Sequence, residues 1–283
     1  MADQPKHVSI YGSAVKYWTF NDDQPTTIVM VHGFRGTHEG LQKIIDQLPQ
    51  YRIIIPDLPG FGESTPMQAH EHDIPGYTAF LSEFLKKIAP SQPILLGHSF
   101  GSIVAAHLAA MQPNLISKLI LLNPIAASPL KGPRIIFAQL TRAYYWLGCT
   151  LPERSGQALL GSKGIVMITS IALAKTKDPV LRRAIHRSHL QNFSTFQNRD
   201  VIAQSFRASV TATAADRAEA ITMPTLLIAG SIDDVAPAKG QYLLEKRLPN
   251  ARLVMLKDIG HLIHHEAPRE AAQAIDSFLQ NKV

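Results

Sequence analysis

The chain has 283 residues and a formal net charge of +6, and 46% of its residues are hydrophobic. This length suits one large domain, or one domain with an insertion, and it can bury a sizeable core. The single cysteine, Cys149, excludes an internal disulfide and a cysteine-based metal site. Residues 1–6 are polar, and we find no run of 18 uncharged apolar residues. We therefore expect no secretory signal, no transmembrane helix and a cytoplasmic protein.

Short apolar runs alternate with helical patterns over the first 124 residues. Residues 8–10 and 15–20 predict an antiparallel hairpin, because a Gly-Ser turn separates two strand-like runs. Buried strands are expected at 27–31, 52–55, 93–96 and 118–122. Helices are expected at 41–48, 74–89 and 102–110, where apolar residues recur at helical spacing.

The pattern changes between Ile125 and Ile221, where we find helical periodicity and no convincing strand. Strand patterns return at 224–229 and 252–256, and a last amphipathic helix is expected at 268–279. Alternating strands and helices predict an α/β fold, with a mainly parallel sheet and helices on both faces. We therefore predict an inserted all-helical cap, with these boundaries: core 1–124 and 222–283, cap 125–221.

The positive charge is concentrated in the segment 125–221. This segment has 13 Lys and Arg against 5 Asp and Glu, a net charge of +8, whereas the remainder has 15 against 17, a net charge of −2. No basic motif with interleaved aromatic residues accompanies the charge, so we expect no nucleic-acid partner. Two interpretations stay open: a solvated helical surface, or a surface that attracts an anionic lipid or substrate.

The sequence Gly97-His98-Ser99-Phe100-Gly101 lies between a predicted strand and an alanine-rich helix. This order, strand, G-x-S-x-G and helix, is that of a nucleophile elbow. A serine on so sharp a turn needs neighbours without side chains, which the two glycines supply. The turn places the N–H of Phe100 at a helix N-terminus, where it can stabilise an oxyanion. The alternative is a chance glycine-serine loop, but the strand and helix around it favour a nucleophilic Ser99.

A nucleophilic serine needs a base, and the base needs an acid that orients it. Such side chains should emerge at the carboxyl ends of parallel strands. Asp233 and Asp234 follow the strand at 224–229, and His261 follows the strand at 252–256. Apart from His98, which lies beside Ser99 in the elbow, only His261 among the twelve histidines combines a strand end with a small preceding residue. The residues alone leave Asp233 and Asp234 open as the acid.

Two further strand ends bear on this site. The loop after residue 31 contains His32-Gly33-Phe34, and the N–H of Phe34 is the candidate second oxyanion donor. An ordinary strand-ending turn is the alternative interpretation. Asn123 also ends a strand, but its amide cannot carry the negative charge that stabilises an imidazolium. This chemistry requires no metal and no cofactor.

Together these motifs resemble the α/β-hydrolase superfamily, in the family's order. The matching blocks are His32-Gly33-Phe34, residues 57–64, the elbow, residues 230–237 and Gly260-His261. The resemblance covers about residues 7–124 and 222–281. It implies an eight-stranded sheet and supports Asp233 over Asp234 by the spacing of the acid loop. The roles it implies are Ser99 as nucleophile, Asp233 as acid, His261 as base, and the N–H groups of Phe34 and Phe100 as oxyanion hole.

The resemblance also narrows the reaction. Haloalkane dehalogenases and epoxide hydrolases of this superfamily use an aspartate at the elbow, where this chain has Ser99. Hydrolases of carbon–carbon bonds usually have a more glycine-rich oxyanion loop. We therefore expect a serine hydrolase of carboxylic esters. Lactone, thioester or carbon–carbon hydrolysis, acyl transfer, and a ligand receptor that keeps the triad stay open as alternatives.

Two apolar runs stand out in the predicted cap, at 135–147 and 165–174. One interpretation is that these helices pack on each other and on the sheet. The other is that they partly line a pocket for an acyl chain, or that Trp146 and its basic neighbours contact a membrane. We therefore expect a small-molecule or lipid-like ester with an apolar acyl group as substrate, and we keep peripheral membrane contact as a hypothesis.

Overall fold

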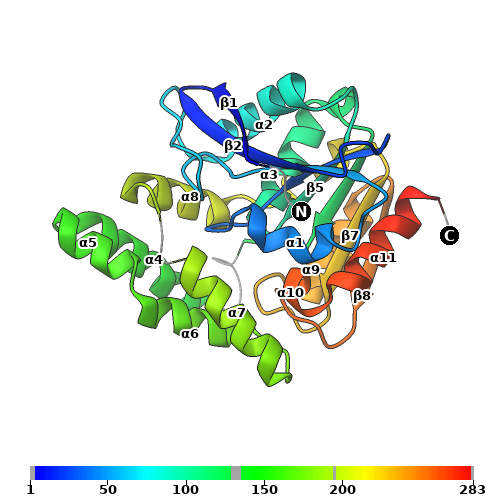
Figure 1. Cartoon of the computed structure of the whole chain (residues 1–283). Helices are drawn as coiled ribbons and strands as arrows, with labels where there is room; N and C mark the ends of the chain where they lie inside the picture. The colour runs from blue at the N-terminus through cyan, green and yellow to red at the C-terminus, as the bar shows by residue number, and fades with distance from the viewer. Residues whose placement is uncertain (1–3, 129–134, 194–195, 282–283) are drawn as a thin grey trace.

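A computed structural model describes residues 4–128, 135–193 and 196–281, without the side chains of 135–138. Eight strands form one sheet in the order β1-β2-β4-β3-β5-β6-β7-β8 (Figure 1). β2 is antiparallel to both neighbours, and all other pairs after it are parallel. The predicted fold class is confirmed. The strands are β1 Lys6–Ile10, β2 Ser13–Phe20, β3 Thr27–Val31, β4 Arg52–Pro56, β5 Ile94–His98, β6 Lys118–Leu122, β7 Thr225–Gly230 and β8 Ala251–Leu256.

Helices occur at each place where the sequence predicts one. The helices are α1 Gln42–Ile45, α2 Ile74–Ile88, α3 Phe100–Met111, α4 Ile135–Thr150, α5 Glu153–Leu160, α6 Lys163–Leu173, α7 Pro179–Asn192, α8 Arg199–Thr211, α9 Ala238–Arg247, α10 Ile263–Glu266 and α11 Pro268–Leu279. The sequence does not predict α9, which lies between the last two strands. The predicted helix at 41–48 is wrong in length. A 3-10 turn at His38–Leu41 precedes the one-turn α1, and further i→i+3 bonds follow it. The spacing of apolar residues there arises because one face of the segment is buried, and a series of turns can bury that face as well as a helix can.

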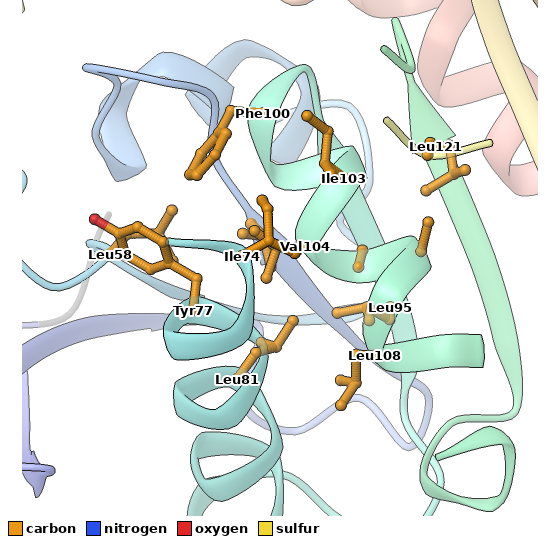
Figure 2. Packing of buried hydrophobic residues seen from close by; sticks show 14 of the residues in the cluster. Leu58, Ile74, Tyr77, Leu81, Leu95, Phe100, Ile103, Val104, Leu108 and Leu121 are labelled. Carbon is orange, nitrogen blue, oxygen red and sulfur yellow. The ribbon is translucent and has the colours of Figure 1, made fainter. Parts of the chain in front are cut away.

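Successive residues of the central strands face opposite sides of the sheet, so each strand serves two cores. On one side Val29, Leu95 and Leu121 join the cluster that includes α2 and α3. On the other side, residues such as Met30 and Leu96 join the cluster that includes α1, α10 and α11. Figure 2 shows the first cluster, in which side chains from α2 and α3 interdigitate beside the sheet. Both faces are covered, which explains why these strands are uniformly apolar.

Five helices, α4 to α8, lie between β6 and β7, and the described residues of this segment contain no strand. α4 packs against α5 and α8, and α6 packs against α7. Figure 1 shows α4 to α7 grouped to one side of the sheet. The division of the chain into a core and a cap stays a prediction from the sequence.

One stretch has the length and hydropathy of a membrane span, although the sequence predicts no transmembrane helix. The 21 residues Glu153–Leu173 are long enough and apolar enough to cross a membrane, and no other stretch of the described residues is. In the structure this stretch is two helices, α5 and α6, of 8 and 11 residues, separated at Gly161 and Ser162. Each is shorter than the roughly 20 residues a membrane span needs. The sequence count missed the stretch because polar residues interrupt its apolar run.

Candidate active site

Ser99 lies on the sharp turn between β5 and α3, with φ of 52° and ψ of −116°. Residues with a β-carbon rarely adopt this region, so the surrounding chain must hold it there. A β-carbon on Gly97 would lie 2.4 Å from the carbonyl oxygen of Gly101. A β-carbon on Gly101 would lie 2.4 Å from the carbonyl oxygen of Val31. Both glycines are therefore required for the turn that presents Ser99.

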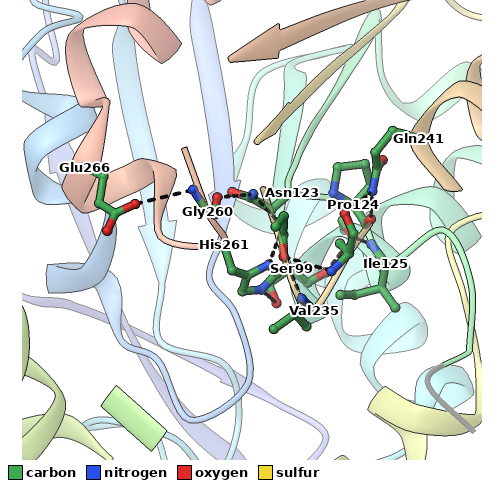
Figure 3. A network of polar contacts seen from close by, with 12 residues as sticks. Ser99, Asn123, Pro124, Ile125, Val235, Gln241, Gly260, His261 and Glu266 are labelled. Atoms are coloured by element: carbon green, nitrogen blue, oxygen red, sulfur yellow. Dashed lines mark hydrogen bonds and ion pairs between the residues drawn. The ribbon is translucent and has the colours of Figure 1, made fainter. Parts of the chain in front are cut away.

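The structure brings Ser99, His261 and Asp233 together from three strand ends. Ser99 Oγ lies 2.9 Å from His261 Nε2 (Figure 3), and His261 Nδ1 lies 2.8 Å from Asp233 Oδ2. With an ionised carboxylate at Nδ1, the proton belongs on that nitrogen, and Nε2 is free to accept from the serine hydroxyl. Asp234 instead pairs with Lys175 at 2.6 Å on the surface. The geometry thus selects Asp233 over Asp234 as the partner of His261.

Asp233 is buried but well supplied with donors. Its Oδ1 accepts the N–H groups of Val235 and Ala236 at 2.7 and 2.9 Å, and its Oδ2 also accepts Asn123 Nδ2 at 3.0 Å. Burial alone would raise the pKa of Asp233, but His261 and these N–H donors outweigh it and lower the pKa to about 2. The carboxylate therefore stays ionised over the range in which a histidine can act as a base.

Asn123 is a residue of this site that sequence reasoning set aside. It has a positive φ of 46°, and its N–H donates to Ile228 O at 2.8 Å. Its side-chain amide donates to Asp233 Oδ2 and, at 3.3 Å, to the carbonyl of Gly260. One amide thus ties the loop of Asp233 to the loop of His261. Its place at the end of β6, between the strands that precede Ser99 and Asp233, is the signal that could have identified it.

Glu266 ties the base loop to the helical segment. Its Oε2 accepts the N–H of Gly260 at 3.4 Å (Figure 3). Its Oε1 accepts the N–H groups of Lys175 and Thr176, both at 2.7 Å. These two residues connect α6 to α7, so the loop before His261 is held against that connection.

Both candidate oxyanion donors lie beside Ser99. Phe100 is the first residue of α3, so its N–H has no partner within the helix. The loop of Phe34 passes close by, since a β-carbon on Gly33 would lie 3.3 Å from Ser99 Cβ. His32 braces this loop, with Nδ1 2.8 Å from Gly33 O and Nε2 accepting the N–H of Leu58 at 2.9 Å.

Aromatic rings from both parts of the chain surround Phe34. Its ring centroid lies 6.4 Å from that of Phe100, 5.8 Å from Tyr145 of α4 and 6.1 Å from Phe206 of α8. Tyr145 and Phe206 stack on each other at 4.1 Å. The loop of Phe34 therefore faces apolar side chains supplied by the helical segment. A separate cavity of about 750 Å³ lies between α2, α3 and α8, and none of Ser99, Asp233 and His261 lines it.

A run of histidine rings leads away from His261. Ring centroids are 5.9 Å apart for His261 and His98, 4.3 Å for His98 and His264, 4.3 Å for His264 and His265, and 6.0 Å for His265 and His189. Burial lowers the pKa of His98 and of His189 to about 3, and that of His265 to about 4. Within the described part of the chain, no three such side chains are placed to hold a metal ion. The rings of His98, His189 and His265 are therefore uncharged at neutral pH.

This cluster predicts loss of stability in mild acid. The unfolded chain binds protons on histidine below about pH 6.5, whereas the folded chain keeps His98, His189 and His265 neutral until the pH reaches about 4 or lower. Stability is therefore fully present above about pH 6.5 and is lost as the pH falls. Each of the three lowers the free energy of unfolding by about 2 kcal/mol at pH 5.

Urea unfolding at pH 7.5, 6 and 5 measures this effect. The variant His265→Gln should flatten the decline by about 2 kcal/mol at pH 5, because one proton fewer is taken up on unfolding. Carboxylates such as Asp233 titrate lower and do not contribute in this range. A free energy of unfolding that stays constant between pH 7.5 and 5 would contradict the prediction.

Two named proteins are similar in sequence to this chain over most of its length. Lipase 1 of Psychrobacter immobilis is 25% identical over 261 residues, which cover 89% of this chain and 76% of that protein. A pimeloyl-[acyl-carrier protein] methyl ester esterase of Vibrio vulnificus is 27% identical over 269 residues, covering 93% of this chain and 97% of the relative.

The fold is shared with solved structures. A thermophilic esterase from Thermogutta terrifontis superposes with a TM-score of 0.74 at 20% sequence identity, over 99% of this chain and 98% of that chain. A sequence model described as the alpha/beta hydrolase fold matches residues 26–268, which is most of the chain. The motifs, the sheet order and this match agree, and the chain belongs to the α/β-hydrolase fold family.

Proposed function

We propose that this protein is a serine hydrolase that cleaves a carboxylic ester with an apolar acyl group. The observation that carries the proposal is the hydrogen-bonded series Ser99, His261 and Asp233, which begins at a strained elbow. Nucleophile, base and orienting acid at these distances are the arrangement needed for acyl transfer through a serine. Relatives described as a lipase and a methyl ester esterase support the ester as the substrate class.

The mechanism follows from these positions. Ser99 Oγ attacks the ester carbonyl while His261 Nε2 takes its proton, and the N–H groups of Phe34 and Phe100 stabilise the resulting oxyanion. His261 then gives the proton to the departing alcohol, which leaves an acyl group on Ser99. The same imidazole activates a water that releases the acid and restores the serine. Asp233 fixes the tautomer and stabilises the imidazolium that forms in each step.

The aromatic rings of Tyr145 and Phe206 beside Phe34 support an apolar acyl group. With p-nitrophenyl esters of increasing acyl length, we expect kcat/KM to rise by up to about fourfold for each methylene group buried, since burial of one contributes about 0.8 kcal/mol. The rise in kcat/KM should stop when the acyl chain extends beyond these aromatic rings. The highest kcat/KM on the acetate, with a steady decline for longer chains, would contradict the apolar acyl group.

The alternatives are tested in the same panel. Lactones, thioesters and carbon–carbon substrates use the same triad, and a higher kcat/KM on one of them would reassign the reaction. Acyl transfer would show as ester product when an alcohol is added to the reaction. A ligand receptor would react with a fluorophosphonate but show no multiple turnover on any ester.

We also propose that segment 125–221 is a cap over Ser99, and that the protein works in the cytoplasm with peripheral membrane contact. Exposed apolar side chains on α4 and α6 support this contact: Trp146 is 65% exposed and Ile168 70%. A segment with net charge +8 favours an anionic surface.

Sedimentation with lipid vesicles tests the membrane contact. We expect binding to phosphatidylglycerol vesicles that weakens in high salt and in Trp146→Ser, because both charge and apolar insertion contribute. The variant Met111→Ser is the matched control, since Met111 is also exposed, at 55%, but lies on α3. Absence of binding to anionic vesicles, or equal binding to uncharged ones, would contradict the contact.

A further inference from the structure

Arg35 combines two unusual features, a left-handed backbone conformation and a buried side chain, that a place in the loop after β3 does not explain. It follows Phe34 directly, and its φ of 56° lies in the left-handed region. It is only 6% exposed. A residue with a side chain rarely adopts this region unless its surroundings hold it there, so the contacts of the guanidinium are informative.

The guanidinium reaches the ends of two helices in the helical segment. Arg35 Nη2 donates to the carbonyl of Leu160, the last residue of α5, at 3.1 Å, and to the carbonyl of Phe193, the residue after α7. Carbonyls at a helix C-terminus lack partners within the helix and carry partial negative charge. A cation is therefore stabilised at this place, and one side chain joins the oxyanion loop to α5 and α7.

No carboxylate of residues 4–128, 135–193 and 196–281 forms an ion pair with Arg35. The buried charge therefore depends on these carbonyls, on the phenol groups of Tyr144 and Tyr145, and on the ring of Phe196, whose centroid lies 5.7 Å from the guanidinium carbon. Moving the helix ends away would deprive a buried cation of its carbonyl acceptors, which is costly. The positions of α5 and α7 and the position of the loop that contains Phe34 and Arg35 are therefore energetically linked.

The loop has little room to move without affecting the reaction. A β-carbon on Gly33 would lie 3.2 Å from His98 Nδ1 and 3.3 Å from Ser99 Cβ, so the backbone passes directly over the elbow. An oxyanion donor acts only when it lies about 3 Å from the developing charge. We propose that Arg35 is a positioning residue, which holds the N–H of Phe34 in the oxyanion hole by anchoring its loop to the C-termini of α5 and α7. This inference rests on the proposed ester hydrolysis.

The matched control is Arg199, which makes similar bonds elsewhere. Arg199 Nη1 donates to the carbonyls of Gly148, at 3.3 Å, and Leu151, at 2.8 Å, near the end of α4. It therefore joins helices of the same segment by the same chemistry, without a bond to the oxyanion loop. The end of α5 keeps a donor when Arg35 is removed, because Tyr144 Oη also donates to Leu160 O at 3.1 Å. Arg35→Met should therefore still fold.

Ester hydrolysis by Arg35→Met, Arg35→Lys and Arg199→Met gives the first readout. We expect Arg35→Met to lower kcat by about 10- to 100-fold, part of the loss seen when an oxyanion donor is removed outright, with KM changed by no more than about threefold. Arg35→Lys should recover part of kcat because it keeps a cation at the carbonyls. Arg199→Met should keep kcat within about threefold, whatever its effect on thermal stability.

Amide hydrogen exchange over residues 32–37 gives a readout that needs no turnover. We expect faster exchange in Arg35→Met than in wild type and in Arg199→Met, because the loop is released locally. Unchanged exchange in Arg35→Met, or equal losses of kcat in both methionine variants, would overturn the inference. If wild type hydrolyses no ester, the proposed function fails separately, and the exchange data still decide whether Arg35 holds the loop.

Discussion

The variant Ser99→Ala should lower kcat/KM for an ester substrate by a factor of about 10⁴ to 10⁶. Alanine removes the oxygen that forms the acyl-enzyme but keeps the β-carbon and leaves the close approach of Gly97 to Gly101 unchanged, so the elbow should be preserved. Steady-state hydrolysis of p-nitrophenyl esters measures the loss. Circular dichroism and the thermal midpoint should match the wild type, which separates lost chemistry from lost folding.

More than about 1% of the wild-type kcat/KM in Ser99→Ala would mean that another group attacks the ester, since a triad without its nucleophile retains far less. Ser170 is the serine to examine in that case. Its Oγ lies 2.7 Å from His186 Nδ1 and 2.8 Å from His189 Nδ1, but its side chain is fully buried between α6 and α7. It has no route to a substrate in this conformation, so we expect Ser170→Ala to keep the activity.

The variant Asp233→Asn should lower kcat by about 10³- to 10⁴-fold. An asparagine amide can donate to His261 Nδ1, which then moves the proton to Nε2, where it no longer accepts from Ser99. The neutral amide also gives no stabilisation to the imidazolium. The N–H groups of Val235 and Ala236 would still donate to the side-chain oxygen, so the loop should keep its shape, although Asn123 Nδ2 would lose its acceptor.

Asp234→Asn is the control for this effect, because Asp234 is adjacent in sequence but pairs with Lys175 on the surface. We expect its kcat to stay within about threefold of wild type, as surface substitutions away from the site usually change little. Equal losses in both variants, or a larger loss in Asp234→Asn, would show that the acid is wrongly assigned.

Most of the fold, and the meeting of Ser99, His261 and Asp233, could be predicted because their signals are local. The turn at Ser99 requires a glycine two positions to either side on steric grounds, and both glycines are visible in the adjacent sequence. The carboxyl ends of parallel strands then limit where Asp233 and His261 can lie. The choice between two adjacent aspartates had no local signal, and only the spacing of the family's acid loop pointed to Asp233.

The residues that sequence reasoning missed act through contacts between distant segments. Asn123 bonds Asp233, 110 positions further along the chain, and Arg35 bonds the carbonyl of Leu160, 125 positions away. Glu266 reaches Lys175 over 91 positions. No periodicity or motif encodes these pairings, because they depend on how distant segments meet at the strand ends. Arg35 and Glu266 join the helical segment to the loops of Phe34 and His261, whereas Asn123 joins the loops of Asp233 and His261 to each other.

Reaction with a fluorophosphonate, followed by peptide mass spectrometry, tests most directly that Ser99 is a nucleophile activated by His261. We expect one equivalent of adduct on Ser99 in the wild type, no adduct in Ser99→Ala, and a labelling rate in His261→Gln reduced by about 10³-fold or more. Modification of a different serine, or an unmodified Ser99 in protein that hydrolyses esters, would contradict the account.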